Sequence, residues 1–196
     1  YILADSVLDM PQFNLLYGSL YAIATGYIEF EKIEIGPLYD AYSYNEVEGS
    51  RFGLELYTTD EMSRTIMPSV FVAYGTNDKE FKYGGDITWI QNRNPRGEWY
   101  ASYSKDVDQL GMMGFFDQGN IFNTALYIGD AQNKLSMVTI AEASFLGEFG
   151  KGFTSFVEFR HRKVEGRGEL NFDVEGNNQA LITAESTFQI RYAKNE

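Results

Sequence analysis

Two pairs of carboxylates have a spacing that could support chemistry on a β-strand. Glu46 and Glu48 form one pair, and Asp106 and Asp108 form the other. Side chains alternate across a strand, so residues i and i+2 lie on the same face. Such a pair could act as a general acid and base, or it could bind a hard cation. The competing interpretation is structural, with the four residues at turns or on a polar face and Glu48 paired with Arg51. The structural interpretation is favoured, and no residue is predicted to be catalytic.

Other kinds of site have little support in the composition. His161 is the only histidine, and the chain has no cysteine. A single imidazole without a thiolate or a second histidine does not make a zinc site. His161 lies between Arg160 and Arg162, and we interpret it as a polar residue near a strand end. The sequence contains no G-x-S-x-G motif, no P-loop and no dinucleotide-binding fingerprint. We therefore predict neither a metal nor a cofactor.

The composition narrows the class of protein. With 196 residues, the chain is one domain or part of a larger one, and 44% hydrophobic residues argue against disorder. A net charge of -12 argues against nucleic-acid binding, which depends on clustered Lys and Arg. The chain begins without Met and ends directly after a strand pattern, so we expect a portion of a longer protein.

The chain divides at residue 26. Asp9 and Pro11 can begin a helix, and apolar residues recur at helical spacing until Gly26 stops the pattern. Residues 1–26 are therefore predicted to be an N-terminal segment with one short helix. Residues 27–196 are predicted to be a β-barrel region that is truncated at both ends.

Beyond residue 26, apolar and polar residues alternate with a period of two, which predicts strands. About ten strands are expected, with the ~9–11 residues typical of tilted membrane strands rather than the ~5–6 of soluble sheets. No βαβ rhythm is present, so the strands should be antiparallel. The predicted fold class is all-β: an antiparallel transmembrane outer-membrane β-barrel with one short N-terminal helix. The predicted strands are 27–35, 51–59, 66–74, 79–91, 98–105, 121–128, 135–149, 153–162, 169–174 and 181–192.

The two faces of the predicted strands differ. Lys82, Arg160 and Arg191 are placed mid-strand on the face opposite the aromatic residues. A cation facing lipid near the midplane would cost about 2–4 kcal/mol. These residues should therefore face a polar interior together with Glu55, Asp86, Glu158 and Glu185, where the cations would be paired with the carboxylates or hydrated. Aromatic residues near the strand ends would form an interfacial girdle. The same pattern also fits a soluble sheet with one wet face.

Several motifs occur in a characteristic order. They are Gly36-Pro37, Tyr44-Asn45-Glu46-Val47-Glu48-Gly49-x-Arg51, Tyr74-Gly75-x-x-Asp78-x-x-Phe81-Lys82-Tyr83-Gly84 and Tyr103-Ser104-x-Asp106-Val107-Asp108. In this order the chain resembles the barrel portion of large Bacteroidetes outer-membrane proteins of unknown function that carry an N-terminal carboxypeptidase-regulatory-like domain. The resemblance covers roughly residues 9–196.

The resemblance implies a signal peptide, an upstream β-sandwich domain and further strands after Glu196. The regulatory-like domain is not itself a peptidase, so the resemblance implies no catalytic residue. It marks structural motif positions, which are Asn45, Glu46, Glu48, Gly49, Arg51, Asp78, Lys82, Tyr83 and Gly84, with Asp106 and Asp108 in the last of the four motifs.

The expected function is that of a non-enzymatic protein of the bacterial outer membrane. It would act as a channel, as an export or assembly component, or as a scaffold of an envelope complex. Its expected partners are the lipid bilayer and other outer-membrane or periplasmic proteins, and not nucleic acid. The main alternative is a soluble β-sheet domain that binds glycan or peptide through exposed aromatic residues. A barrel-borne hydrolase is a third interpretation, which would need His161 or an acidic site.

Overall fold

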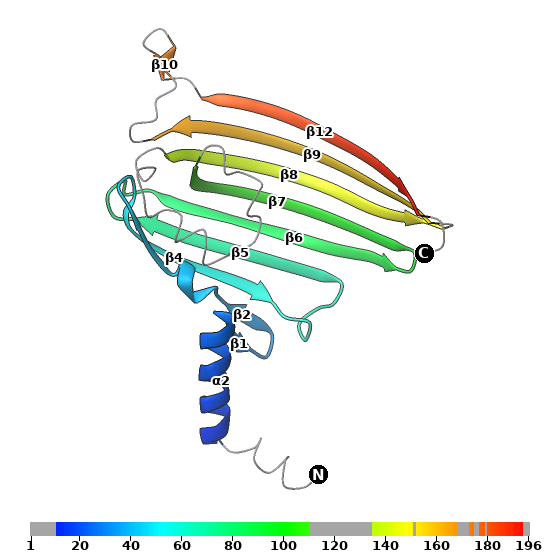
Figure 1. Cartoon of the computed structure of the whole chain (residues 1–196), viewed down its shortest axis with the longest axis horizontal. Coiled ribbons are helices and arrows are strands. Elements are labelled where there is room, and N and C mark those ends of the chain that lie inside the picture. The colour runs from blue at the N-terminus through cyan, green and yellow to red at the C-terminus, as the bar shows by residue number, and fades with distance from the viewer. Residues whose placement is uncertain are drawn as a thin grey trace.

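The computed structural model describes residues 11–109, 135–150, 152–167, 173–174, 177–178 and 180–193. Within these ranges, the predicted N-terminal helix is present as α2 (Pro11–Thr25) and is followed by strands (Figure 1). No helix in this part of the chain is long and apolar enough to cross a membrane. The strands are β1 (Ile28–Phe30), β2 (Ile33–Ile35), β3 (Tyr42–Asn45), β4 (Gly49–Thr58), β5 (Ile66–Gly75), β6 (Phe81–Arg93), β7 (Arg96–Gln109), β8 (Leu135–Phe149), β9 (Phe153–Gly166), β10 (Asp173–Val174), β11 (Asn177–Asn178) and β12 (Leu181–Tyr192).

The prediction of an antiparallel all-β fold is confirmed. A 10-stranded sheet has the order β1-β2-β4-β5-β6-β7-β8-β9-β12, with β3 also paired to β4, and β10 and β11 form a separate pair. From β4 onward, each strand of the main sheet pairs with the strands of that sheet that precede and follow it in sequence, as short connections favour. In the described part of the chain the sheet is open, with β1 and β12 at its edges. The predicted strand 121–128 and residues 169–172 lie outside the described residues.

The N-terminal edge of the sheet differs from the prediction. The predicted strand 27–35 is a hairpin of the two short strands β1 and β2. The unpredicted β3 pairs with the first residues of β4, while β2 pairs with its last residues. Between them the η1 turn (Leu38–Asp40) crosses over β4 at Gly53, where a Cβ would lie 2.9 Å from the Asp40 carbonyl oxygen. Short strands and a crossing turn therefore make this edge irregular.

The predicted alternation of the two faces is confirmed by the pairing register. One row of direct cross-strand partners is polar and contains Glu34, Tyr57, Ser69, Asp86, Ser102, Glu142, Arg160 and Glu185. The adjacent row, on the other face, contains Ile35, Leu56, Val70, Gly85, Tyr103, Ala141, His161 and Ala184. A register slip of one residue would exchange the two sets.

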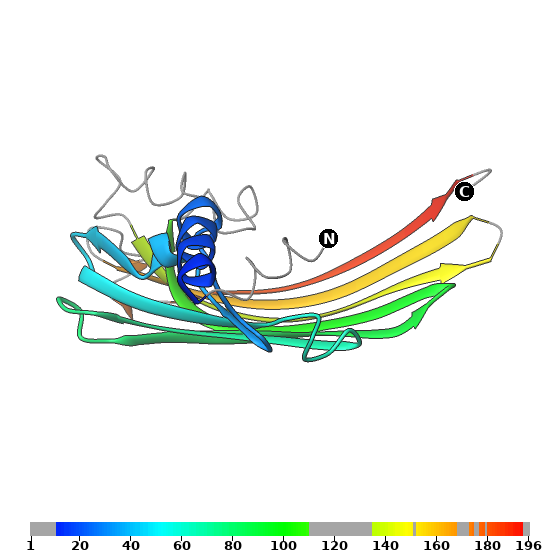
Figure 2. The same ribbon diagram turned by 90° about the horizontal axis from the view of Figure 1, so that it is seen from below.

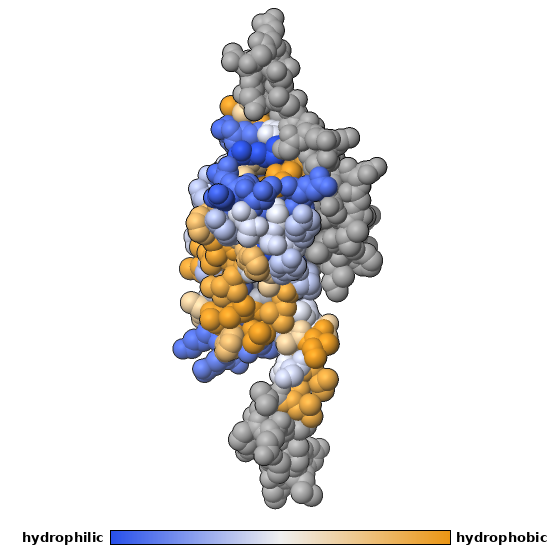
Figure 3. All heavy atoms as spheres, turned by 90° about the vertical axis from the view of Figure 1, so that its left-hand side faces the viewer, coloured by the Kyte–Doolittle hydropathy of each residue, from blue (hydrophilic) through white to orange (hydrophobic). Residues whose placement is uncertain are grey.

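The polar face is the concave one. Figure 2 shows that the sheet is bowed, with α2 and the η1 turn on its concave side. Gly53, which lies under η1, shares a cross-strand row with Ala73 and Lys82. The convex face carries large apolar side chains that are exposed, and Figure 3 shows such residues (orange) gathered on one side of the sheet. They include Phe52, Leu54, Val70, Val72, Tyr83, Ile87, Trp89, Trp99, Tyr103, Phe159, Phe188 and Ile190.

The prediction for His161 was wrong. The structure extends β9 to Gly166, four residues past the predicted end of that strand, so His161 lies in the strand interior. Its direct neighbours are Ala141 and Ala184 on the convex face. It therefore does not share a face with the carboxylates of Glu158 and Glu142.

Candidate functional site

The turn between β3 and β4 directs a carboxylate toward the sheet. The side-chain oxygen of Asn45 accepts hydrogen bonds from the backbone N–H groups of Val47 (3.1 Å) and Glu48 (2.7 Å). The Asn45 Nδ2 donates to Glu48 Oε2 at 2.8 Å. Gly49 follows with a φ of 71°, a conformation that glycine adopts without steric cost. Asparagine and glycine therefore set the local turn, and Glu48 becomes buried.

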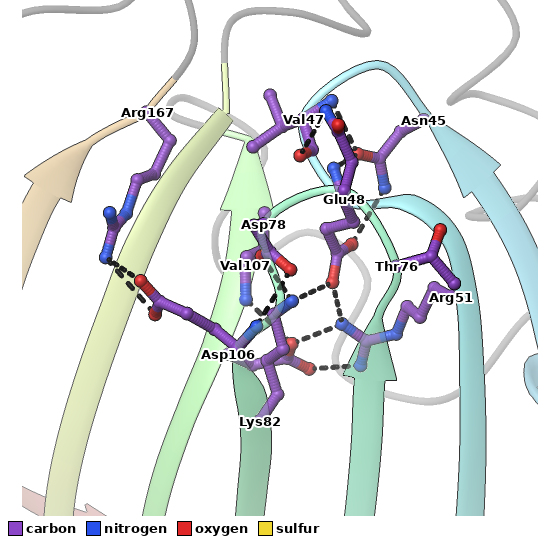
Figure 4. Close-up of polar contacts among 12 residues, drawn as sticks. Asn45, Val47, Glu48, Arg51, Thr76, Asp78, Lys82, Asp106, Val107 and Arg167 are labelled. Carbon is purple, nitrogen blue, oxygen red and sulfur yellow. Dashed lines mark hydrogen bonds and ion pairs between the residues drawn. The ribbon is translucent and has the colours of Figure 1, made fainter.

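Glu48 joins two cations of the sheet. Its Oε1 accepts a hydrogen bond from Arg51 Nη1 at 3.0 Å and lies 2.8 Å from Lys82 Nζ. Arg51 also donates two parallel hydrogen bonds to Asp106, of 2.6 and 2.9 Å. Lys82 pairs with Asp78 in the β5–β6 turn. Figure 4 shows these five side chains converging from β4, β6, β7 and the two turns, and we call them the ion-pair cluster.

The β3–β4 turn and the β5–β6 turn also interlock through their backbones. The N–H of Asn77 donates to the Glu48 carbonyl at 2.7 Å, and Asn77 Nδ2 donates to the Glu46 carbonyl at 3.0 Å. A Cβ on Gly49 would lie 2.7 Å from Thr76 Oγ1. A Cβ on Gly75 would lie 2.8 Å from Lys82 Nζ, so this glycine makes room for the ammonium group. Gly75, Thr76 and Asn77 were not singled out as site residues from the sequence.

Burial makes the ion pairs of the cluster interdependent. The Lys82 side chain is 0% exposed and the Glu48 side chain 3% exposed, whereas Asp106 is 33% exposed. A buried charge that loses its partner is strongly unfavourable. The cations already compensate the carboxylates and occupy many of their lone pairs, so the arrangement is suited to fixing turns rather than to moving protons. Among the described residues, no group of three His, Cys, Asp or Glu could hold a metal ion.

A second set of charges joins the β5–β6 turn to β7 and to the residue that follows β9. Glu80 lies 3.7 Å from Lys105 Nζ and 3.0 Å from Arg167 Nη2. The contact with Arg167 joins residues 87 positions apart in the sequence. Glu80 and Arg167 were missed as site residues because no local pattern indicates a contact across such a separation.

The structure brings together most of the predicted motif positions. Asn45, Glu48, Gly49, Arg51, Asp78, Lys82 and Asp106 all belong to the interlocked turns or to the ion-pair cluster. The predicted pairing of Glu48 with Arg51 is confirmed. Of the other four motif positions, Glu46 contributes only its backbone carbonyl to the interlocked turns, and Tyr83, Gly84 and Asp108 lie outside the turns and the cluster.

The positions of these four residues follow from the turn and from the strand register. Glu46 is exposed in the turn, in agreement with the favoured structural interpretation, and it does not share a strand face with Glu48. Asp108 lies two residues beyond Asp106 on β7, opposite Ser136. Tyr83 is on the convex face beside Tyr103, with ring centroids 6.3 Å apart. Gly84 pairs with Phe71, and the Phe71 ring occupies the space that a side chain at Gly84 would take.

The predicted partners of the strand cations need one correction. Lys82 is the second residue of β6 rather than mid-strand, and it pairs with Glu48 and Asp78 instead of Glu55 or Asp86. The prediction for Arg160 is confirmed, because it lies 3.4 Å from Glu158. Glu142 is a further partner of Arg160, at 2.9 Å.

Comparison with known proteins gives one match. A family model described as "Family of unknown function (DUF5686) C-terminal domain" matches residues 15–172. Neither the curated proteins nor the solved structures contain a match to this chain.

Proposed function

The chain belongs to the DUF5686 C-terminal-domain family of unknown function, and from this premise we propose that it forms part of the wall of a transmembrane β-barrel in a bacterial outer membrane. The barrel acts as a channel, as an export or assembly component, or as a scaffold of an envelope complex, and it does not catalyse a reaction. The proposal includes a Bacteroidetes source and a carboxypeptidase-regulatory-like domain upstream of the barrel.

The observation that carries the proposal is the apolar convex face. Phe159, Phe188 and Ile190 have 62%, 69% and 62% of their surface exposed. Soluble monomers rarely expose contiguous apolar patches larger than a few hundred Å². Here exposed apolar side chains occur on the convex rows from β4 to β12. Such a surface is unfavourable in water and suits a bilayer, where lipid chains cover it.

Two rows of aromatic residues on the convex face also support its contact with a membrane. Tyr42, Phe52, Tyr74 and Phe81 are successive cross-strand partners, and Trp89, Trp99 and Phe145 form a second row. Phe81 and Trp89 are both on β6, about 26 Å apart along the strand at ~3.3 Å per residue. A strand tilt of about 40° reduces this to a height of roughly 20 Å, comparable to the ~25 Å apolar band of outer-membrane barrels.

The concave face supports the same proposal. Its central row carries five charged side chains, and Arg160 is paired with two carboxylates there. Polar residues on the inner side of a barrel wall can be hydrated, whereas they would be costly against lipid. The ion-pair cluster lies at one end of this wall and joins the ends of β4, β6 and β7.

The test uses the full-length protein in its native cells. We expect it to remain in the membrane fraction until detergent extracts it, and to migrate differently in gels before and after heating. A full-length protein that stays soluble without detergent would contradict the proposal.

A soluble binding domain is the second candidate, because exposed aromatic pairs could stack against a sugar ring. Trp99 and Phe145 have ring centroids 4.5 Å apart on the convex face, and Tyr83 and Tyr103 form another pair. In this case the protein would be soluble, and Trp99→Ala would weaken its binding to a glycan or peptide array.

A further inference from the structure

The connections between the strands differ in length at the two ends of the sheet. At the end that carries the ion-pair cluster, which we call the cluster end, the connections are residues 46–48, 76–80, 110–134 and 167–180. At the opposite end, the short-turn end, they are residues 31–32, 59–65, 94–95 and 150–152. In Figure 1 the cluster end is at the left and the short-turn end at the right. Both of the long connections are therefore at the cluster end.

If the sheet spans an outer membrane, this difference in length indicates which end of the sheet faces the periplasm. Outer-membrane barrels have short turns on the periplasmic side and longer loops on the outside of the cell. In an antiparallel meander every second connection lies at the same end, so one orientation assigns all of the connections together. The two shortest connections between long strands, 94–95 and 150–152, both lie at the short-turn end.

The two turns at the cluster end are fixed by interactions within the chain. The β3–β4 and β5–β6 turns are held by the ion-pair cluster and by backbone hydrogen bonds, such as that from Asn77 to Glu48. Exposed polar residues such as Glu46 and Lys79 project from these turns.

We propose that the cluster end faces the outside of the cell and that the short-turn end faces the periplasm. This orientation rests on the proposed function as an outer-membrane barrel. It makes the β3–β4 and β5–β6 turns part of the cell surface, where extracellular molecules first meet the protein. Periplasmic partners would meet the turns at 59–65, 94–95 and 150–152.

Single introduced cysteines test the orientation, because residues 1–196 contain no cysteine and any cysteine elsewhere in the full-length protein can first be replaced by serine. Glu46→Cys reports on the cluster end and Glu61→Cys on the short-turn end. Both glutamates are exposed in connections, so the two variants are a matched pair. Gly150→Cys adds a second site at the short-turn end, where an added side chain meets open space.

The full-length variants are treated with a membrane-impermeant maleimide, first on intact cells and then after lysis of the outer membrane. We expect Glu46→Cys to be labelled on intact cells, and Glu61→Cys and Gly150→Cys to be labelled only after lysis. Heat-modified gel mobility of each variant shows that it has folded.

Other results would overturn the orientation. Labelling of Glu61→Cys on intact cells, with or without labelling of Glu46→Cys, contradicts it while leaving the membrane location intact. If all three variants are labelled only after lysis, the orientation is also wrong. In that case, recovery of the protein without detergent shows that the proposed function has failed as well, whereas recovery in the membrane fraction shows that only the orientation has failed.

Discussion

Lys82 is the residue on which the ion-pair cluster depends most directly. Its ammonium group is fully buried and lies between the carboxylates of Glu48 and Asp78. We expect Lys82→Met to lower the free energy of unfolding by about 3–5 kcal/mol, because two carboxylates lose a buried partner. Denaturant titration of the protein refolded in detergent or lipid would measure the change.

Lys32→Met is the matched control for that experiment. Lys32 is exposed in the turn between β1 and β2, so the same substitution should change stability by no more than about 0.5 kcal/mol. If Lys82→Met cost no more than Lys32→Met, the cluster would not stabilise the fold.

Gly49 tests the interlocked turns. Its positive φ disfavours a side chain, and a Cβ would press on Thr76 and Asn77. We expect Gly49→Ala to cost at least about 1–2 kcal/mol from the backbone conformation alone. In Gly97→Ala the nearest atom to the new Cβ would be 3.9 Å away, so this variant serves as the control. Equal losses of stability in the two variants would show that the contact between the turns is not needed.

At the scale of the strand, the same substitution should have different costs in stability on the two faces of the sheet. Ala101 and Ser102 are neighbours on β7, with Ala101 on the convex face and Ser102 on the concave face. If the convex face meets lipid, Ala101→Arg should cost about 2–4 kcal/mol in a bilayer. Ser102→Arg should cost much less, because its side chain remains hydrated.

Folding titrations in phospholipid vesicles measure both values. A small and equal cost for Ala101→Arg and Ser102→Arg would indicate that both faces meet water. That outcome would favour the soluble binding domain over the barrel wall.

The strands differ in how far the sequence could predict them. Alternation identified both faces of β9, because Phe159 and Arg160 differ so sharply in polarity. β3 has only four residues and lies beside a crossing turn, so it has too little periodicity to be recognised. The approach of Asp106 to Arg51 depends on the register of β4 through β7 across 55 residues. Neither residue type nor local spacing encodes that register directly.

At the scale of the whole molecule, the two edges of the sheet are unlike. β1 has three residues, whereas β12 has 12 residues that pair on one side with β9. Hydrocarbon offers no water to the backbone groups on the other side of β12. If the protein forms the proposed barrel, a further strand should therefore cover this side of β12 in the full-length protein.

Hydrogen exchange of the membrane-embedded protein would test that expectation. All backbone amides within β12 should exchange slowly if the strand is paired on both sides. Fast exchange at every second amide would instead mean that one side of β12 is open to water.

The sequential pairing of the strands also has a consequence for assembly. Each long strand pairs with the long strand that precedes it in sequence, so the sheet can be built from its irregular N-terminal edge toward β12. The ion-pair cluster closes once β7 is in place, because Asp106 supplies its last carboxylate. The first half of the sheet would thus become a stable folding unit before β8, β9 and β12 are added, and it would serve as the template on which they align.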